Sequence, residues 1–98
     1  MQINKIKNEN QLTLALEGRL DTTTSPALEE ELNNSVDGIT ELVFDFEKLE
    51  YISSAGLRVL LAAQKKMNVQ GKMVIKNVCS DIQEIFDITG FSDILTVE

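Results

Sequence analysis

The sequence contains no histidine and no tryptophan, and it has only one cysteine and one proline among its 98 residues. Without histidine the chain cannot build the Ser-His or Cys-His couples that activate nucleophiles, and zinc sites lose their commonest nitrogen ligand. We therefore expect no catalytic residues, no bound metal and no cofactor. The single cysteine, Cys79, excludes an internal disulfide and fits a reducing compartment. Its neighbours Val78 and Ile82 predict a buried structural thiol without a chemical role.

Positive charge and long apolar runs are also scarce. Nine Lys and Arg residues stand against sixteen Asp and Glu, which gives a formal net charge of −7. No basic cluster exceeds the pair Lys65-Lys66, so the surface would repel a phosphate backbone and we expect no nucleic-acid binding. The apolar run near Leu57 is broken by Arg58 and ends at Gln64, short of the roughly 20 residues that span a bilayer. With no apolar signal core at the amino terminus, we expect a cytoplasmic protein without membrane insertion.

The apolar residues recur every second position in some segments, which predicts strands, and every three to four positions in others, which predicts helices. Leu12, Leu14 and Leu16 alternate with less apolar residues, which predicts a strand that ends at Gly18 and forms a hairpin with a weak edge strand. We expect the edge strand at residues 3–6, further strands at 42–46, 73–75 and 94–97, and helices that begin near Ser25, Ser53 and Ser80.

Each expected helix has start and stop signals. Ser25 before Pro26 is typical of a helix start, and Ser80 with Gln83 resembles a capping box. Gly90 is the expected end of the last helix. The residues expected to face inward are Leu28, Leu32 and Val36 in the first helix, Leu57, Leu60, Leu61 and Met67 in the second, and Ile82, Ile85, Phe86 and Ile88 in the third.

This order predicts one α/β domain over residues 1–98, with a mixed, mostly parallel sheet of about five strands and three to four helices. Such sheets place contact sites at the carboxyl ends of their strands. Two loops qualify, residues 18–22 and residues 50–54. If both connections are crossovers in one sheet, Asp21 and Ser54 should be neighbours in space.

The serine pair Ser53-Ser54 admits four interpretations. A nucleophile elbow lacks its leading glycine and its histidine, and a phosphate-binding loop lacks its lysine. Alternatively, Ser53 is an ordinary helix cap and Gly56 only allows close packing. The fourth interpretation is a modification site, because a phosphate on the first helical turn meets free N–H groups and the positive end of the helix dipole.

Five segments in order resemble the STAS-domain anti-sigma-factor antagonists of bacteria. They are Gly18-Arg19-Leu20-Asp21, residues 42–46, residues 49–57 around Ser53-Ser54-Ala55-Gly56-Leu57, residues 71–74 and residues 85–91. Together they cover nearly the whole chain. The resemblance implies a STAS-like fold and a non-enzymatic switch.

In that family the antagonist binds an anti-sigma factor, which is a serine kinase, and thereby frees the sigma factor. Phosphorylation of a serine at the start of the second main helix ends the interaction, and a serine phosphatase restores it. By motif position the resemblance places the phosphoacceptor at Ser54, with Ser53 as the alternative, and the family aspartate at Asp21. The partner surface is expected to comprise Asp21, Thr22, Ser53, Ser54, Gly56 and Arg58.

The sequence departs from the family pattern at Ser53, where the antagonists commonly carry an aspartate. Other STAS domains regulate transporters or multi-protein complexes, so the alternative is an interaction module that is not phosphorylated, with both serines serving only as caps. A free-standing chain with no second domain favours the antagonist. We expect a monomer or a weak dimer.

Overall fold

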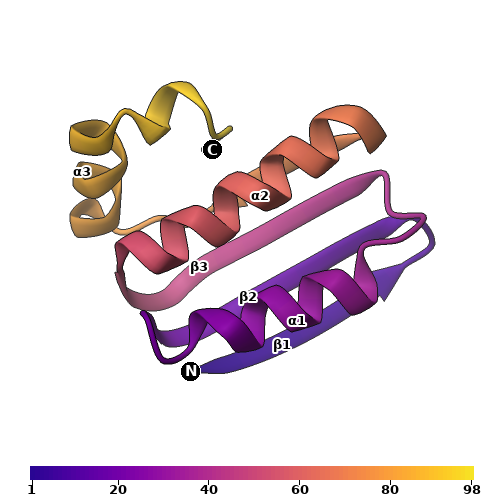
Figure 1. Cartoon of the computed structure of the whole chain (residues 1–98), viewed down its shortest axis with the longest axis horizontal. Helices are drawn as coiled ribbons and strands as arrows, with labels where there is room; N and C mark the ends of the chain where they lie inside the picture. Colours follow the sequence, from indigo (N-terminus) through magenta and orange to yellow (C-terminus); the bar gives the residue numbers. More distant parts are fainter.

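A four-stranded mixed sheet organises the chain in the computed structural model, which describes all 98 residues. The antiparallel hairpin lies at one edge, and the remaining pairs are parallel. The predicted α/β class is therefore confirmed (Figure 1). In spatial order the strands are β1 (Gln2–Asn8), β2 (Gln11–Leu20), β3 (Glu41–Ile52) and β4 (Lys72–Lys76).

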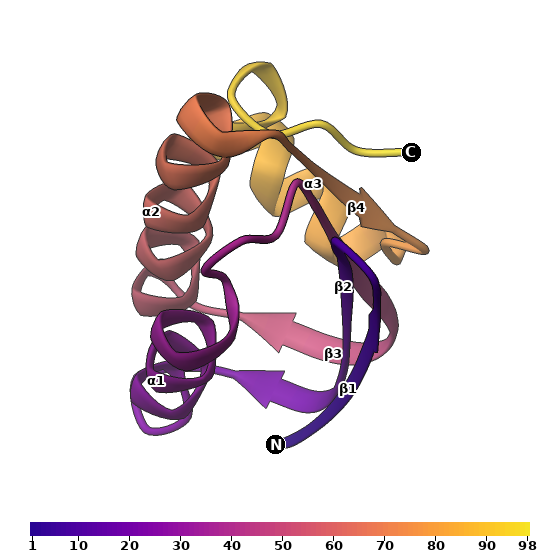
Figure 2. The same ribbon diagram turned by 90° about the vertical axis from the view of Figure 1, so that its right-hand side faces the viewer.

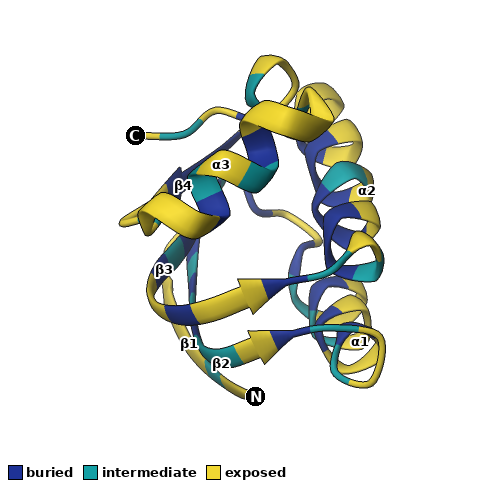
Figure 3. Ribbon diagram, turned by 90° about the vertical axis from the view of Figure 1, so that its left-hand side faces the viewer, coloured by how far each residue is buried: buried dark blue, intermediate teal, exposed yellow.

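Three helices follow β2, β3 and β4 in turn. They are α1 (Ser25–Ser35), α2 (Ser54–Gln70) and α3 (Ser80–Thr89), and a short 3₁₀ helix spans Phe91–Asp93. Figure 2 shows α1 and α2 side by side on one face of the curved sheet. Each of these helices turns its buried side toward the strands (Figure 3).

The core lies between this helical layer and the sheet. Leu12 and Leu14 of β2 are fully buried and pair in register with Leu42 and Phe44 of β3. Because alternate side chains of a strand point to the same face, this register builds one continuous apolar surface. The helices cover it with their predicted stripes, including Leu28, Leu32, Leu57, Leu60 and Met67.

Both parallel strands that lead to the site are longer than predicted. β2 continues past Gly18 to Leu20, and β3 continues to Ile52. The pairing register shifts between Gly18 and Arg19, where Gly18 has φ +98°. A glycine with positive φ accommodates a β-bulge. The pairing of β2 with β3 therefore continues beyond Gly18, where the sequence predicts that the strand ends. Only Ser53 remains between β3 and α2.

The predicted strand at residues 94–97 does not form, and the sheet has four strands instead of about five. Ile94 keeps helical dihedral angles, and Leu95 N donates to Phe91 O at 2.8 Å. The backbone becomes extended only after this turn. What remains of the expected strand is a single parallel bridge between Ile75 and Val97.

Two helix starts also differ from the prediction. Ser25 is the first residue of α1 and its hydroxyl donates to Asp21 O at 2.6 Å, so it is not the cap. At α3 the residue in the cap position is Cys79, and the side chain of Gln83 donates to Asp87 instead of closing a capping box.

The predictions for Cys79 and Ile88 were wrong about burial. Cys79 is exposed because it lies outside the first turn of α3. Ile88 is 76% exposed, whereas Ile82 and Phe86 are fully buried. At about 100° per residue, Ile88 lies about 200° around the helix from Phe86 and points away from the core. The predicted glycine stop is confirmed by Gly90 at φ +82°.

The contrast within α3 gives a test of the fold. We expect Ile82→Ala to lower the free energy of unfolding by about 2–5 kcal/mol, because it empties a fully buried position. The same substitution at Ile88 should change it by no more than about 0.5 kcal/mol. Urea denaturation of both variants measures the difference, and equal losses would contradict the placement of α3.

Candidate functional site

The two loops that were predicted to meet do lie at the same edge of the sheet, which is the one formed by the carboxyl ends of β2 and β3. Leu20 and Ile52, the last residues of β2 and β3, are paired in parallel register. Immediately beyond them, Ser53 N donates to Leu20 O at 2.9 Å. Asp21 and Ser54 each lie one residue beyond this hydrogen bond. In Figure 1, β3 ends and α2 begins at the left-hand end of the molecule.

The two serines have different roles at the start of α2. Ser53 is extended, with φ −100° and ψ 175°, and its hydroxyl accepts a long hydrogen bond from Gly56 N at 3.5 Å. The predicted capping role of Ser53 is thus confirmed. Ser54 is the first helical residue and is exposed, and its side chain makes no hydrogen bond within the chain. Its hydroxyl is accessible to another molecule.

Gly56 sets how closely α2 approaches the sheet. A Cβ at this position would lie 2.8 Å from Leu20 Cγ and 2.9 Å from Ile52 Cγ1, which is inside van der Waals contact. The predicted close packing is confirmed. Because Gly56 is buried, it shapes the expected partner surface from beneath.

Asp21 organises the turn between β2 and α1. Its Oδ1 accepts hydrogen bonds from Thr23 N at 3.0 Å, Thr23 Oγ1 at 2.7 Å and Thr24 N at 3.2 Å. The hydroxyl of Thr23 contributes most to lowering the pKa of the Asp21 carboxyl below its ordinary value, the amides add to this, and desolvation opposes it. Thr24 Oγ1 also donates to Arg19 O at 2.8 Å.

The role of these threonines was not predicted from the sequence. An aspartate that bonds the backbone two and three residues on is the signature of an Asx turn, and Asp21 followed by three threonines is the signal that could have revealed it. The carboxylate of Asp21 is consequently bound to its own loop, which orients the loop at the sheet edge.

Arg19 and Tyr51 form a second cluster that the sequence analysis did not identify. They are paired across β2 and β3, and Arg19 Cζ lies 4.2 Å from the centroid of the Tyr51 ring. Arg19 Nε is also 3.8 Å from Asp21 Oδ2. Cation–π stacking and this weak ion pair together hold an exposed guanidinium beside the Asp21 loop.

A shallow hollow separates the first turns of α1 and α2. It has a volume of about 220 Å³, and its lining includes Thr22 and Ser25 from one side and Ala55 and Arg58 from the other. Of the expected partner residues, it brings together Thr22 and Arg58.

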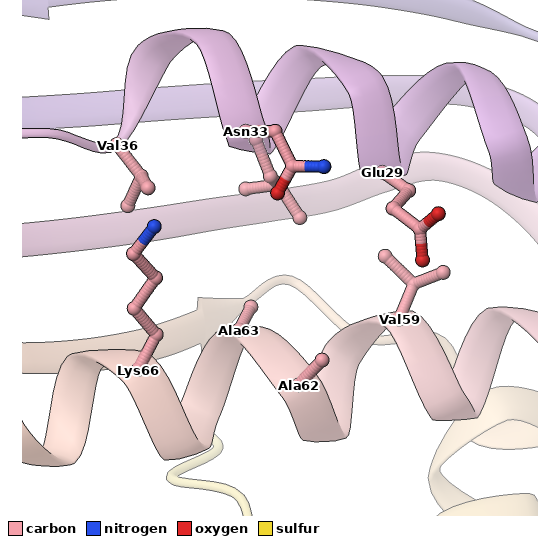
Figure 4. A pocket seen from close by; sticks show the side chains of 8 residues that line it. Glu29, Asn33, Val36, Val59, Ala62, Ala63 and Lys66 are labelled. Atoms are coloured by element: carbon pink, nitrogen blue, oxygen red, sulfur yellow. The ribbon is translucent and has the colours of Figure 1, made fainter.

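The seam between the two helices continues into a second hollow of about 180 Å³. Figure 4 shows Glu29 of α1 and Val59 of α2 facing each other across this hollow, with Lys66 reaching toward Val36 farther along. Glu29 and Val59 line both hollows, so the seam leads directly to the Ser54 edge.

Two general features of the chain bear on its chemistry. No three His, Cys, Asp or Glu side chains are grouped so that they could hold a metal ion. None of the helices has the length and apolar character required to cross a membrane.

Comparison with known proteins gives consistent matches along the whole chain. The model of the STAS domain family matches residues 2–98. BtrV of Bordetella bronchiseptica, which is named an anti-sigma factor antagonist, is 37% identical over 99 residues, covering 99% of this chain and 85% of that protein. The anti-sigma-B factor antagonist of Bacillus subtilis is 28% identical and covers 93% of this chain and 84% of its own length.

Solved structures share the fold. An anti-sigma factor antagonist from Mycobacterium paratuberculosis has a TM-score of 0.88 at 22% identity, over 98% of this chain and 83% of that one. SpoIIAA in its unphosphorylated form has a TM-score of 0.79 at 16% identity, over 99% of this chain and 87% of that one. SpoIIAA is also known in a phosphorylated form, with a TM-score of 0.78 at 16% identity, over 99% of this chain and 91% of that one.

The close approach at Gly56 makes a testable prediction. Gly56→Ala should lower the free energy of unfolding by about 1–3 kcal/mol, since the added methyl group must displace Leu20 and Ile52. Ser54→Ala, at an exposed position of the same turn, should change it by no more than about 0.5 kcal/mol. Thermal and urea denaturation compare the two, and an unchanged Gly56→Ala protein would argue against the packing described here.

The Asp21 turn predicts a dependence on pH. Because the pKa of Asp21 is lowered on folding, its stabilising contribution is present above the ordinary value of 3.8 and is lost as the pH falls through the lowered pKa. Thr23→Val should raise the pKa of Asp21 toward that ordinary value, while Thr22→Val should leave it in place because Thr22 makes no hydrogen bond to Asp21. An NMR titration of the Asp21 carboxyl distinguishes them, and identical curves would refute the assignment.

Proposed function

This chain is a STAS domain of the anti-sigma factor antagonist family, and on that premise we propose that it is a switch controlled by phosphorylation of Ser54. In the unmodified state it binds an anti-sigma factor of the serine-kinase class and so releases a sigma factor. Phosphorylation of Ser54 by that kinase ends the binding, and a serine phosphatase restores it. The protein itself performs no chemistry in this cycle.

The main support for the proposal is that the hydroxyls of the two serines have different roles. Ser53 uses its hydroxyl as the cap of α2, whereas the hydroxyl of Ser54 is exposed and unengaged at the carboxyl end of the sheet. A kinase requires an accessible hydroxyl that it can reach without unfolding the substrate. Ser54 meets this requirement better than Ser53, which is half-buried.

The surface around Ser54 is suited to docking a protein. Thr22 and Arg58 line the hollow beside the start of α2, and the Asp21 loop lies at the same end of the sheet. Arginine is enriched at protein interfaces, and the two hollows offer an uneven surface into which partner side chains can pack. We propose that the anti-sigma factor covers this edge, with Asp21, Thr22, Ser54 and Arg58 as contacts and Ser53 at its margin.

A phosphate on Ser54 would change this surface chiefly through charge. It adds roughly −1.5 to −2 units at pH 7 to a chain whose formal charge is already −7. At the centre of an interface such a group must be desolvated or repelled, so binding weakens even if the fold stays the same. The known phosphorylated form of the structural relative SpoIIAA supports this proposal.

The proposal predicts where phosphate is incorporated. Incubation with an anti-sigma factor kinase from the same bacterium and ATP should add one phosphate to the wild type and to Ser53→Ala, and none to Ser54→Ala. Mass spectrometry of the peptide containing both serines assigns the position. Phosphate on Ser53 alone, or on neither serine, would refute the assignment.

The same variants separate the switch from a constitutive interaction module. Ser54→Asp should weaken binding to the kinase by about tenfold or more through like-charge repulsion, while Ser54→Ala should bind as the wild type does. Isothermal titration calorimetry with unmodified protein gives both affinities. Equal affinities would remove charge as the mechanism and would favour a module that regulates a transporter or a larger complex.

A further inference from the structure

Arg58 is one of three basic residues without an acidic partner, together with Lys7 and Lys65, and it is the only basic residue that lines the hollow at the start of α2. Six of the nine Lys and Arg side chains lie within 4.0 Å of a carboxylate. Arg58 makes no ion pair and no side-chain hydrogen bond, although the chain carries sixteen acidic residues. Its exposed guanidinium lies beside the hollow at the start of α2.

The position of Arg58 on α2 relates it directly to Ser54. The two residues are four apart in one continuous helix, so their side chains leave the same face at neighbouring positions. An anion that precedes a cation by four residues is the more favourable order on a helix. The planar guanidinium can also donate two parallel hydrogen bonds to a phosphate, which a lysine cannot.

We infer that Arg58 is the intramolecular receptor for a phosphoryl group on Ser54. The inference rests on the proposed function for the origin of that group. The Ser54 oxygen attacks the terminal phosphorus of ATP, the new O–P bond forms as the bond to ADP breaks, and the hydroxyl proton passes to the kinase or to water. Arg58 then donates to the phosphoryl oxygens and offsets part of the added charge.

The other charged groups at this edge leave Arg58 available. Asp21 is bound by Thr23 and Thr24 and lies 3.8 Å from Arg19 Nε. Glu29 lines the same hollow from α1, but it faces Val59 and forms no ion pair with Arg58 (Figure 4). Glu29 is the only acidic residue among those that line this hollow.

The test places the phosphate without a kinase. Phosphoserine is encoded genetically at position 54, and its second ionisation is followed by ³¹P NMR in the otherwise unchanged chain and in Arg58→Gln. Because a nearby guanidinium favours the dianion, the phosphate pKa should be lower with Arg58 present, by roughly 0.3 to 1 unit. Arg58→Lys should retain part of the shift in the phosphate pKa, since lysine keeps the positive charge but cannot donate two parallel hydrogen bonds.

Lys65→Gln is the matched control, because Lys65 is an exposed cation without an ion pair on the same helix, well beyond the first turn. It should leave the phosphate pKa unchanged. Identical titrations with and without Arg58, or an equal shift in Lys65→Gln, would overturn the inference. Since the phosphate is installed genetically, failure of a kinase to modify Ser54 would count against the proposed function alone, while the titration still decides the role of Arg58.

Discussion

The approach of α2 to the ends of β2 and β3 is the constraint on which the candidate site depends. At Gly56 the helix backbone lies so close to Leu20 and Ile52 that no side chain fits between them. This contact fixes where α2 begins, and the start of the helix in turn places Ser53 within hydrogen-bond distance of Leu20 O. Because Gly56 has no Cβ, α2 can begin close to the ends of β2 and β3, and the serine pair then lies near the Asp21 loop.

The consequences of that contact extend through both loops. Because Ser53 alone connects β3 to α2, Ser54 has little freedom to leave the sheet edge. On the other side, the carboxylate of Asp21 holds the backbone of Thr23 and Thr24, so the turn into α1 is organised by its own side chain. The proposed docking surface is therefore largely formed before a partner arrives, which would reduce the entropic cost of binding.

Much of this arrangement could be predicted from the sequence because it depends on local signals. The alternation of Leu12, Leu14 and Leu16, the cap at Ser53 and the positive-φ glycine at position 90 are all read from neighbouring residues. The meeting of Asp21 and Ser54 at one edge followed from the handedness and parallel direction of the crossovers alone.

The errors arose where partners distant in sequence decide the outcome. Gly18 looks like the end of a strand, yet pairing with β3 continues across a bulge that only the register of both strands reveals. Ile88 fits a helical apolar pattern, but it lies on the side of α3 that points away from the core, and only the packing of the helix decides which side that is. The pairing of Arg19 with Tyr51 likewise depends on a register that neither strand specifies by itself.

The serine at position 53, where related antagonists commonly carry an aspartate, is best understood from the charges around Ser54. Serine and aspartate are comparable helix caps, but an aspartate would place a second anion next to a phosphate on Ser54. In this chain the cap is neutral, the Asp21 carboxylate is already hydrogen-bonded, and a cation stands one turn along the helix at Arg58. A phosphate on Ser54 would therefore meet the positive end of the α2 dipole and one unpaired guanidinium, in a chain whose net charge is −7. On the proposed function, a serine at position 53 would keep the cap of α2 while reducing the charge repulsion around a phosphate on Ser54.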